Sequence, residues 1–245
     1  MMTSDNSTRL IPPIWRHDAY TLNRLAQAIS VTAKSILSSC EVNPNVVDLG
    51  AGTTPYRPIF EQWDANYVAC DIDASDNDEV VLIKSGQRID IPDGFANIVA
   101  SFQVLEHVWD IDWYLEEALR LLRTDGKLLL STHGTWPYHP HPTDFRRWTR
   151  DGLIAEIESR GFIVESITPL VGPLAWTTQF RTLGYHHILN RIPLIGPPTS
   201  AIFCTAMYLR MTIEDKLTPK EWLSTNAAVY LLTARKALPP LGIAA

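Results

Sequence analysis

The sequence has few cysteines, little basic charge and no long apolar segment free of proline. Cys40, Cys70 and Cys204 lie far apart and form no CxxC pair, which argues against a disulfide framework or a structural zinc site and favours a reducing, cytoplasmic compartment. The formal net charge is −6, so the chain lacks the excess of Lys and Arg that contacts nucleic-acid phosphates. No apolar stretch follows basic residues near residue 1, so we expect no signal peptide.

One long segment has no acidic residue. Asp and Glu are absent from 166–213, a segment that contains Arg181, His186, His187, Arg191 and Arg210. Residues 192–209 carry no charge, but three prolines interrupt them and disfavour a lipid-exposed helix. We therefore expect no transmembrane helix. Three roles stay open: a lid over a bulky apolar or anionic acceptor, a homodimer interface through 171–213, or a membrane-docking surface.

Apolar periodicity predicts the fold class. Helical spacing from Tyr20 to Ser38 predicts one amphipathic helix. Apolar runs predict strands at 46–50, 67–72, 80–84, 97–102, 127–133, 162–170 and 227–236, with helices at 111–123 and 150–160. Buried strands that alternate with helices are typical of a parallel sheet covered on both sides. We expect an α/β fold, a doubly wound, Rossmann-like, mostly parallel sheet with helices on both faces.

The expected strands also divide the chain. The predicted parts are an N-terminal arm and helix (1–44), a Rossmann-like core (45–170), a helical cap or lid insertion (171–226) and a final strand with a tail (227–245). Because the insertion lies between two strands of one sheet, we expect it to fold over the core within one domain.

The segment VVDLGAGTTPY predicts a ligand-binding turn. Gly50 and Gly52 allow close approach of the backbone to a ligand, and Asp71 ends the next strand, where a carboxylate can accept hydrogen bonds from ribose hydroxyls. A dinucleotide site would have a third glycine where this chain has Pro55, and Asp48 would repel a pyrophosphate. S-adenosylmethionine is cationic and carries no phosphate, so the charges favour it over NAD.

Four motifs follow one another in a familiar order: DLGAGTTPY, CDID, IDIPDGFANIVASFQVLEHV and LRLLRTDGKLLLSTHG. Together they resemble the class I S-adenosylmethionine-dependent methyltransferases, in particular a small-molecule branch of that family. The resemblance covers residues 45–165, about half of the chain.

The resemblance implies cofactor-binding roles at matching positions: Asp48, Gly50, Ala51, Gly52, Asp71, Ile72, Gln87 and Gln103. The glycine turn with Asp48 would line the methionine end of the cofactor, which Gln103 would border. Asp71 would hold the ribose and Ile72 would pack on the adenine. Gln87 stands where the family often has an acid, and its carbonyl can accept the same hydrogen bond from the adenine amine.

A second motif, STHGTWPYHPHPTDFRRWT, follows the fifth expected strand. Because histidine titrates near neutral pH, we predict a base among His139, His133, His141 and Asp144, with His139 first. Asp144 has an equal alternative role, an ion pair with Arg147 that anchors the loop. A metal site would need His139, His141 and Asp144 on one face, which alternation disfavours, so we expect no metal.

The expected function is therefore S-adenosylmethionine-dependent O-methylation of a sugar or other hydroxylated small molecule, by in-line transfer with a loop histidine as base. The product of the cofactor would be S-adenosylhomocysteine. The acceptor could be a glycan or lipid-linked. Two alternatives stay open: N- or C-methylation of a small metabolite, and an inactive cofactor-binding partner subunit. Two roles stay open for His107: it faces the substrate, or it is a structural histidine near the start of a helix.

Overall fold

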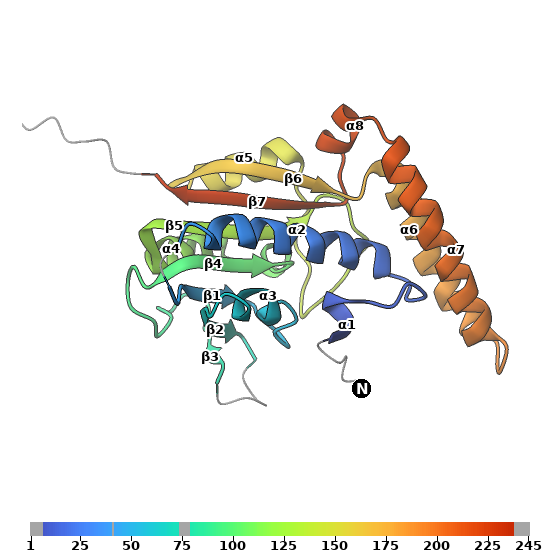
Figure 1. Cartoon of the computed structure of the whole chain (residues 1–245), viewed down its shortest axis with the longest axis horizontal. Coiled ribbons are helices and arrows are strands. Elements are labelled where there is room, and N and C mark those ends of the chain that lie inside the picture. The colour runs from blue at the N-terminus through green and yellow to red at the C-terminus, as the bar shows by residue number, and fades with distance from the viewer. Residues whose placement is uncertain (1–6, 41, 74–78, 238–245) are drawn as a thin grey trace, which may run out of the picture.

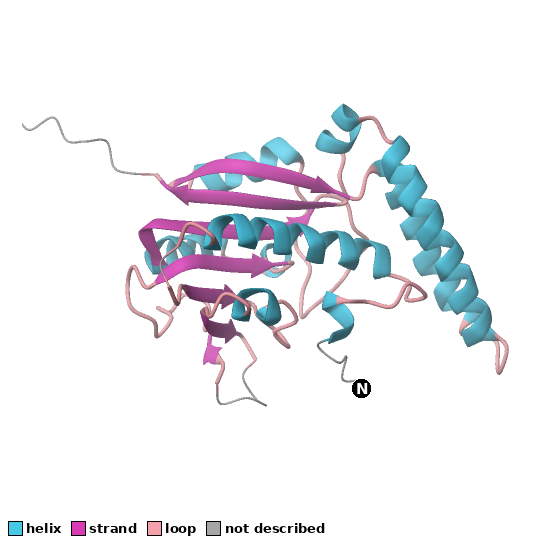
Figure 2. Cartoon of the chain, viewed as in Figure 1, coloured by secondary structure: helices cyan, strands magenta, loops and turns pink. Residues whose placement is uncertain are grey.

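The computed structural model describes residues 7–40, 42–73 and 79–237, so the first residues of the expected arm and the end of the expected tail lie outside the described residues. The described chain forms one seven-stranded sheet with helices on both faces (Figures 1 and 2). The strands are β1 (Asn45–Leu49), β2 (Asn66–Asp71), β3 (Val81–Leu82), β4 (Ala96–Phe102), β5 (Leu122–His133), β6 (Phe162–Leu170) and β7 (Val229–Lys236). The helices are α1 (Ser7–Leu10), α2 (Ala19–Leu37), α3 (Arg57–Glu61), η1 (Leu105–His107), α4 (Ile111–Leu121), α5 (Arg150–Glu158), α6 (Pro173–Leu189), α7 (Gly196–Leu217) and α8 (Lys220–Thr225).

The strand order is β3-β2-β1-β4-β5-β7-β6. β7 runs antiparallel to both β5 and β6, and the other pairings are parallel. This arrangement confirms the doubly wound, mostly parallel sheet. The chain moves outward in one direction from β1 and in the other from β4, so the topology switches between these two neighbours. Ligands of open α/β sheets bind outside the carboxyl ends of the strands at such a switch.

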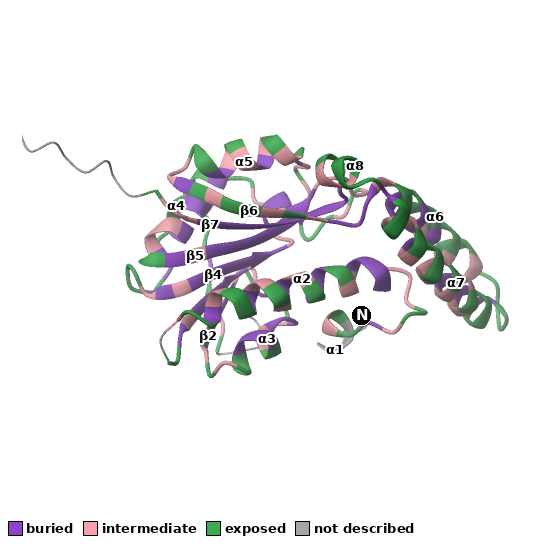
Figure 3. Ribbon diagram, turned by 45° about the horizontal axis from the view of Figure 1, so that its top comes forward, coloured by how far each residue is buried: buried purple, intermediate pink, exposed green. Residues whose placement is uncertain are grey.

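Alternation along the central strands explains why both faces of the sheet are covered. Val46 packs in the cluster beneath α2 and α3, whereas its neighbour Val47 packs in the cluster beneath α4 and α5. Leu231 and Leu232 divide between the same two clusters. Because successive side chains of a strand point to opposite faces, a continuous apolar run needs helices on both sides. Figure 3 shows the resulting buried centre between exposed outer helix faces.

Several element boundaries differ from the predicted ones, and two of these differences concern elements that become shorter beside the sheet. The predicted helix at 111–123 ends at Leu121, because Leu122 has extended backbone angles and pairs with Ala96 at the start of β5. The predicted strand at 80–84 is reduced to Val81–Leu82, which pairs with β2 alone at the edge of the sheet.

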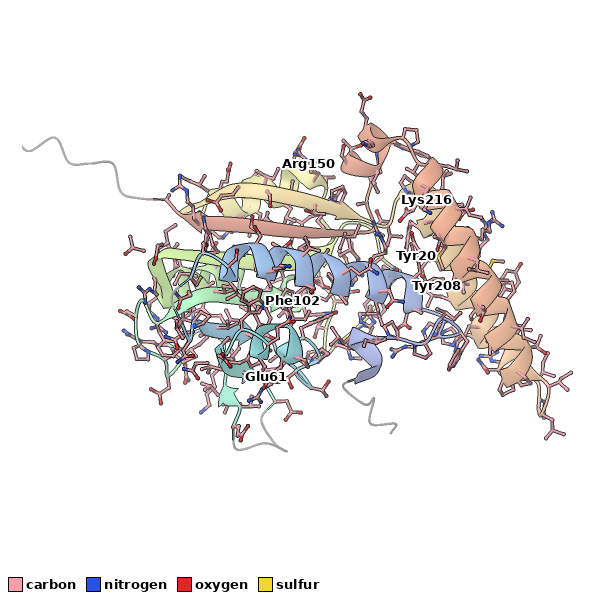
Figure 4. The ribbon with its side chains drawn as sticks, in the orientation of Figure 1. Tyr20, Glu61, Phe102, Arg150, Tyr208 and Lys216 are labelled. Carbon is pink, nitrogen blue, oxygen red and sulfur yellow. The ribbon has the colours of Figure 1, made fainter. Side chains whose placement is uncertain are left out.

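The insertion between β6 and β7 begins with a hairpin of two long helices, α6 and α7. It stands at the end of the sheet where β4 and β6 finish (Figure 1). Its root is fixed to the body by Asp215, whose carboxylate accepts hydrogen bonds from the Tyr20 hydroxyl at 2.7 Å and from the Gly172 backbone N–H at 2.6 Å. The rings of Tyr20 and Tyr208 meet edge to face at 5.5 Å beside this contact (Figure 4). The hairpin is therefore attached through α2.

We predict that Asp215→Ala lowers the free energy of unfolding by about 2–3 kcal/mol, because two donors lose a charged acceptor. Urea denaturation followed by circular dichroism measures the change. Asp125→Ala serves as the matched control, since the Asp125 side chain is 77% exposed and its loss should change stability by less than about 0.5 kcal/mol. Equal stability of the two variants would contradict the anchoring role of Asp215.

Candidate functional site

A cavity of about 620 Å³ lies at the carboxyl ends of the central strands. This volume is in the range of small-molecule and cofactor sites. Its walls come from the β1–α3 turn, the ends of β2 and β4, the segment after β5 and the start of α2. The lining includes most of the predicted site residues: Asp48, Gly50, Ala51, Gly52, Asp71, Ile72, Gln103, His133, His139 and His141. Gln87 and Asp144 are not among the lining residues.

The turn after β1 requires glycine at its first position. Gly50 has a φ of 79°, and a Cβ atom there would lie 2.5 Å from a methyl carbon of Val104. Any larger residue would therefore meet both backbone strain and a steric clash. The turn presses against the chain just after β4 and brings its backbone to the edge of the cavity.

Asp71 connects the turn to the end of β2. Its carboxylate accepts a hydrogen bond from the Gly52 N–H at 2.7 Å and another from the Asp73 N–H at 3.1 Å. A carboxylate has about four acceptor positions, so capacity remains for hydroxyl donors from a ligand. Ile72 follows with an exposed side chain that lines the same cavity.

Asp48 is the most unusual group of the cavity because it is almost completely buried, at 2% exposure. The Tyr67 hydroxyl donates a hydrogen bond to its Oδ2 atom, and its Oδ1 atom has no hydrogen-bond partner within the described chain. Burial raises the pKa of Asp48 to about 7, against the opposing effect of the Tyr67 hydrogen bond. An unpartnered buried carboxylate oxygen beside a cavity fits a cationic ligand group such as an ammonium.

A clamp between Arg147 and Asp144 organises the segment after β5. Arg147 donates hydrogen bonds to both carboxylate oxygens of Asp144 and to the carbonyls of Trp136 and Pro137. Asp144 in turn accepts from the backbone N–H of His139 at 2.7 Å. These contacts hold the pKa of Asp144 at about 2, chiefly through the Arg147 hydrogen bond. These contacts match the anchoring role, one of the two roles that the sequence leaves open for Asp144.

Four imidazole rings gather around one side of the cavity. The ring of His139 lies 4.5 Å from that of His141, 5.8 Å from that of His107 and 6.4 Å from that of His133, between centroids. His107 both lines the cavity and contacts the Thr143 carbonyl, at 2.5 Å from its Nδ1 atom. Burial lowers the pKa of His139 to about 4. Within the described ranges, no group of three or more His, Cys, Asp or Glu side chains could hold a metal ion.

Sequence reasoning missed the contact between Glu106 and His133. Glu106 is fully buried, accepts a hydrogen bond from Thr132 Oγ1 at 2.8 Å and lies 3.2 Å from His133 Nε2. Burial raises the pKa of Glu106 to about 7 and lowers that of His133 well below its usual value. Because burial disfavours the charged form of each group, the contact is not a fixed ion pair. The ring of Trp136 stacks on the imidazole ring of His133, with 4.7 Å between the ring centroids.

Two further differences concern the cavity walls. Gln87 lies outside the cavity, where its backbone carbonyl accepts a hydrogen bond from Trp113 Nε1 at 3.1 Å, and Ser85 is a lining residue instead. Arg9 and Asp18, which no motif indicated, also line the cavity. They belong to the segment before β1, so only the folded chain brings them to the site. Among the described lining residues, none comes from the insertion at 171–226.

Comparisons with known proteins agree with this geometry. The model of a family described as "Methyltransferase domain" matches residues 15–167. Two curated proteins named "Probable S-adenosylmethionine-dependent methyltransferase" are similar. One, from Mycolicibacterium smegmatis, is 32% identical over 84 residues, which cover 32% of this chain and 33% of that protein. The other, from Mycobacterium tuberculosis, is 27% identical over 125 residues, which cover 42% of this chain and 46% of that protein. The matched part thus spans between a third and a half of the length of these relatives.

A solved structure supports the fold. The geranyl diphosphate C-methyltransferase of Streptomyces coelicolor, crystallised with S-adenosylhomocysteine, superposes with a TM-score of 0.54 at 11% identity. The superposition covers 88% of this chain and 80% of that one. At this identity the likeness concerns the arrangement of strands and helices alone.

The environment of His139 predicts an unusual titration. Because its pKa is lowered to about 4, the imidazole should stay neutral from pH 8 down to about pH 5, whereas an ordinary histidine titrates near 6.5. We predict that the Cε1–H resonance of His139 hardly moves over this interval in a heteronuclear NMR titration. His139→Gln identifies the resonance by its loss. A midpoint near pH 6.5 would contradict the assigned environment.

Proposed function

Because the chain belongs to the class I S-adenosylmethionine-dependent methyltransferases, we propose that it transfers a methyl group from S-adenosylmethionine to a hydroxyl oxygen of a sugar or another hydroxylated small molecule. Support comes chiefly from one arrangement. The unpartnered carboxylate oxygen of Asp48 lies in the same cavity as Asp71 and the imidazole of His139. A site for a cationic cofactor and a proton acceptor are thus side by side.

The described residues fit the cofactor group by group. Asp48 would hold the ammonium of its methionine part, since one oxygen is buried without a partner. Asp71 would accept hydrogen bonds from the ribose hydroxyls, and Ile72 would pack on the adenine. When bound, the cofactor supplies a methyl group that its sulfonium activates for displacement by a nucleophile. The protein contributes alignment of donor and acceptor, which can remove a large part of the barrier.

His139 is the base that this geometry favours. It is half-buried and its pKa of about 4 keeps it neutral at physiological pH, so its ring can accept a proton from an acceptor hydroxyl. The Asp144–Arg147 clamp fixes its backbone. His133 is the second candidate, but its side chain is almost completely buried and lies against Glu106. Access to an acceptor therefore favours His139.

Aromatic side chains at the cavity support a carbohydrate acceptor. Trp109 and Phe145 both line the cavity, both are exposed, and their rings lie 5.2 Å apart. Flat apolar surfaces of this kind can pack on the C–H face of a sugar ring while the hydroxyls remain hydrogen-bonded elsewhere. The guanidinium of Arg146 lies over the Trp109 ring at 5.6 Å and fixes one wall of this platform.

Calorimetry with S-adenosylhomocysteine tests the cofactor assignment, with NAD as the negative control. We predict that binding weakens roughly tenfold from pH 8 to pH 6. The ammonium pairs with ionised Asp48, and Asp48 takes up a proton as the pH falls through its pKa of about 7. Asp48→Asn should bind weakly at both pH values and lose this dependence.

Asp90→Asn provides the matched control, because Asp90 is exposed and lies outside the cavity. It should behave like the unchanged protein. A wild-type protein that binds NAD and not S-adenosylhomocysteine would refute the cofactor assignment. Equal pH dependence in Asp48→Asn and the wild type would refute the role of Asp48.

His139→Gln should lower kcat for methyl transfer by about 10²- to 10⁴-fold, the usual contribution of a positioned general base. Its affinity for S-adenosylhomocysteine should be unchanged. Turnover is measured with methyl-labelled S-adenosylmethionine and a panel of free sugars and methyl glycosides, and mass spectrometry locates the methyl group. Full turnover of His139→Gln would remove this residue as the base. Methylation at nitrogen or carbon would replace the proposed O-methylation.

A further inference from the structure

The far end of the α6–α7 hairpin presents apolar side chains to solvent. We call residues 185–202 the hairpin tip. Its exposed apolar side chains are Tyr185, Ile188, Ile192, Leu194, Ile195 and Ile202. Leu194 is 93% exposed and Ile202 is 72% exposed. α6 and α7 both return to the sheet at the root, so the turn between them is the part of the hairpin farthest from the sheet (Figures 1 and 3).

The shape of the tip is fixed mainly by contacts within the hairpin, and the ring of His186 also stacks on that of His17 at 4.3 Å. A Cβ atom at Gly196 would lie 2.2 Å from the Leu189 carbonyl, so glycine allows α7 to begin directly against the end of α6. The Asn190 side chain donates to the His186 carbonyl at 2.9 Å and lies 3.4 Å from Ser200 Oγ. Leu194 has a φ of 65° in the short turn between the helices. The apolar side chains are therefore held outward by a closed turn.

The charges of the hairpin have one sign over most of its length. No Asp or Glu occurs between Ser166 and Ile213, whereas Arg181, His187 and Arg191 are exposed. Exposed apolar groups beside Arg, in a segment that contains no acidic residue, match a negatively charged, partly apolar partner. The interfacial region of an anionic phospholipid bilayer has both properties.

A second copy of the chain fits this surface less well. A symmetric contact between two tips would bring Arg191 of each copy together with no acidic side chain of 166–213 to pair with it. The tip is also a narrow, projecting end, which offers little flat area to a protein partner but can enter the boundary between headgroups and acyl chains. In the described part of the chain, no helix has the length and apolar composition to cross a membrane.

We propose that the hairpin tip docks the protein on anionic phospholipid membranes. Leu194, Ile195 and Ile188 enter the headgroup–acyl boundary, Arg191 contacts lipid phosphates, and Arg181 of α6 adds positive charge behind the tip. The hairpin stands at the same end of the sheet as the cavity (Figure 1). Trp176 of α6 stacks at 4.8 Å on Trp136, a lining residue of that cavity. Docking would therefore hold the hairpin root, and through it one wall of the cavity, in a fixed position relative to the membrane surface.

Cosedimentation of the full chain with vesicles tests the proposal independently of any methyl transfer. We expect binding to vesicles of phosphatidylcholine with phosphatidylglycerol to exceed binding to phosphatidylcholine alone by roughly tenfold or more. Leu194→Asp should reduce binding to the anionic vesicles to the neutral background. Arg181→Gln with Arg191→Gln should remove the preference for the anionic lipid.

Val31→Asp is the matched control, because Val31 is an exposed apolar residue of α2 on the body, at 71% exposure, and should bind like the wild type. Circular dichroism verifies that each variant is folded. Absence of wild-type binding to the anionic vesicles would overturn the proposal, as would full binding by Leu194→Asp. A dimer in analytical ultracentrifugation that Leu194→Asp abolishes, without vesicle binding, would show instead that the tip joins two copies.

Discussion

The buried carboxylate of Asp48 is the constraint around which the cavity is arranged. Moving a carboxylate from water into a protein interior is unfavourable by several kcal/mol unless hydrogen bonds or opposite charges compensate. Here the Tyr67 hydroxyl donates a hydrogen bond to one carboxylate oxygen only. In the protein without a ligand, the pKa of Asp48 rises to about 7, so partial protonation reduces the remaining cost of burying the charge. A cation in the cavity would supply the missing partner. Affinity for positive charge and discrimination against a pyrophosphate would then both come from the Asp48 oxygen that has no partner in the described chain.

On the other wall of the cavity, charged side chains pair with each other behind the loop, and neutral histidines line the cavity. Asp144 and Arg147 satisfy each other behind the loop, and the imidazoles of His139 and His133 that face the cavity have lowered pKa values. A neutral imidazole can accept a proton, and it adds no repulsion toward a cationic ligand held nearby by Asp48. A protonated histidine at the same place could not accept a proton and would repel a cationic ligand. The burial that makes these histidines weak bases therefore also makes them compatible with the cofactor that the family uses.

The sequence predicted the parts of this site that depend on local order along the chain. Apolar runs located the strands, and the spacing from Gly50 to Asp71 placed two motifs at neighbouring strand ends, because parallel strands bring their carboxyl ends to one edge. It could not predict that Glu106 lies against His133 or that Arg9 reaches the cavity, since such contacts depend on how separate elements pack. Nor could the motif order reveal that the Gln87 backbone carbonyl contacts Trp113, a lining residue of the cavity.

The hairpin and the cavity share supporting residues, which gives the orientation of the hairpin a consequence for the site. Thr21 lines the cavity, and its hydroxyl lies 3.4 Å from Gln179 Oε1 of α6, while Gln179 donates to the His17 carbonyl at 2.6 Å. These buried contacts connect the first turn of α2 to the hairpin root, so a surface that holds the tip also holds one cavity wall in place. Exposed apolar side chains lower solubility when they serve no contact. An acceptor that diffuses freely would need no such tip, whereas an acceptor presented at a membrane would gain from a cavity held in a fixed position relative to that membrane.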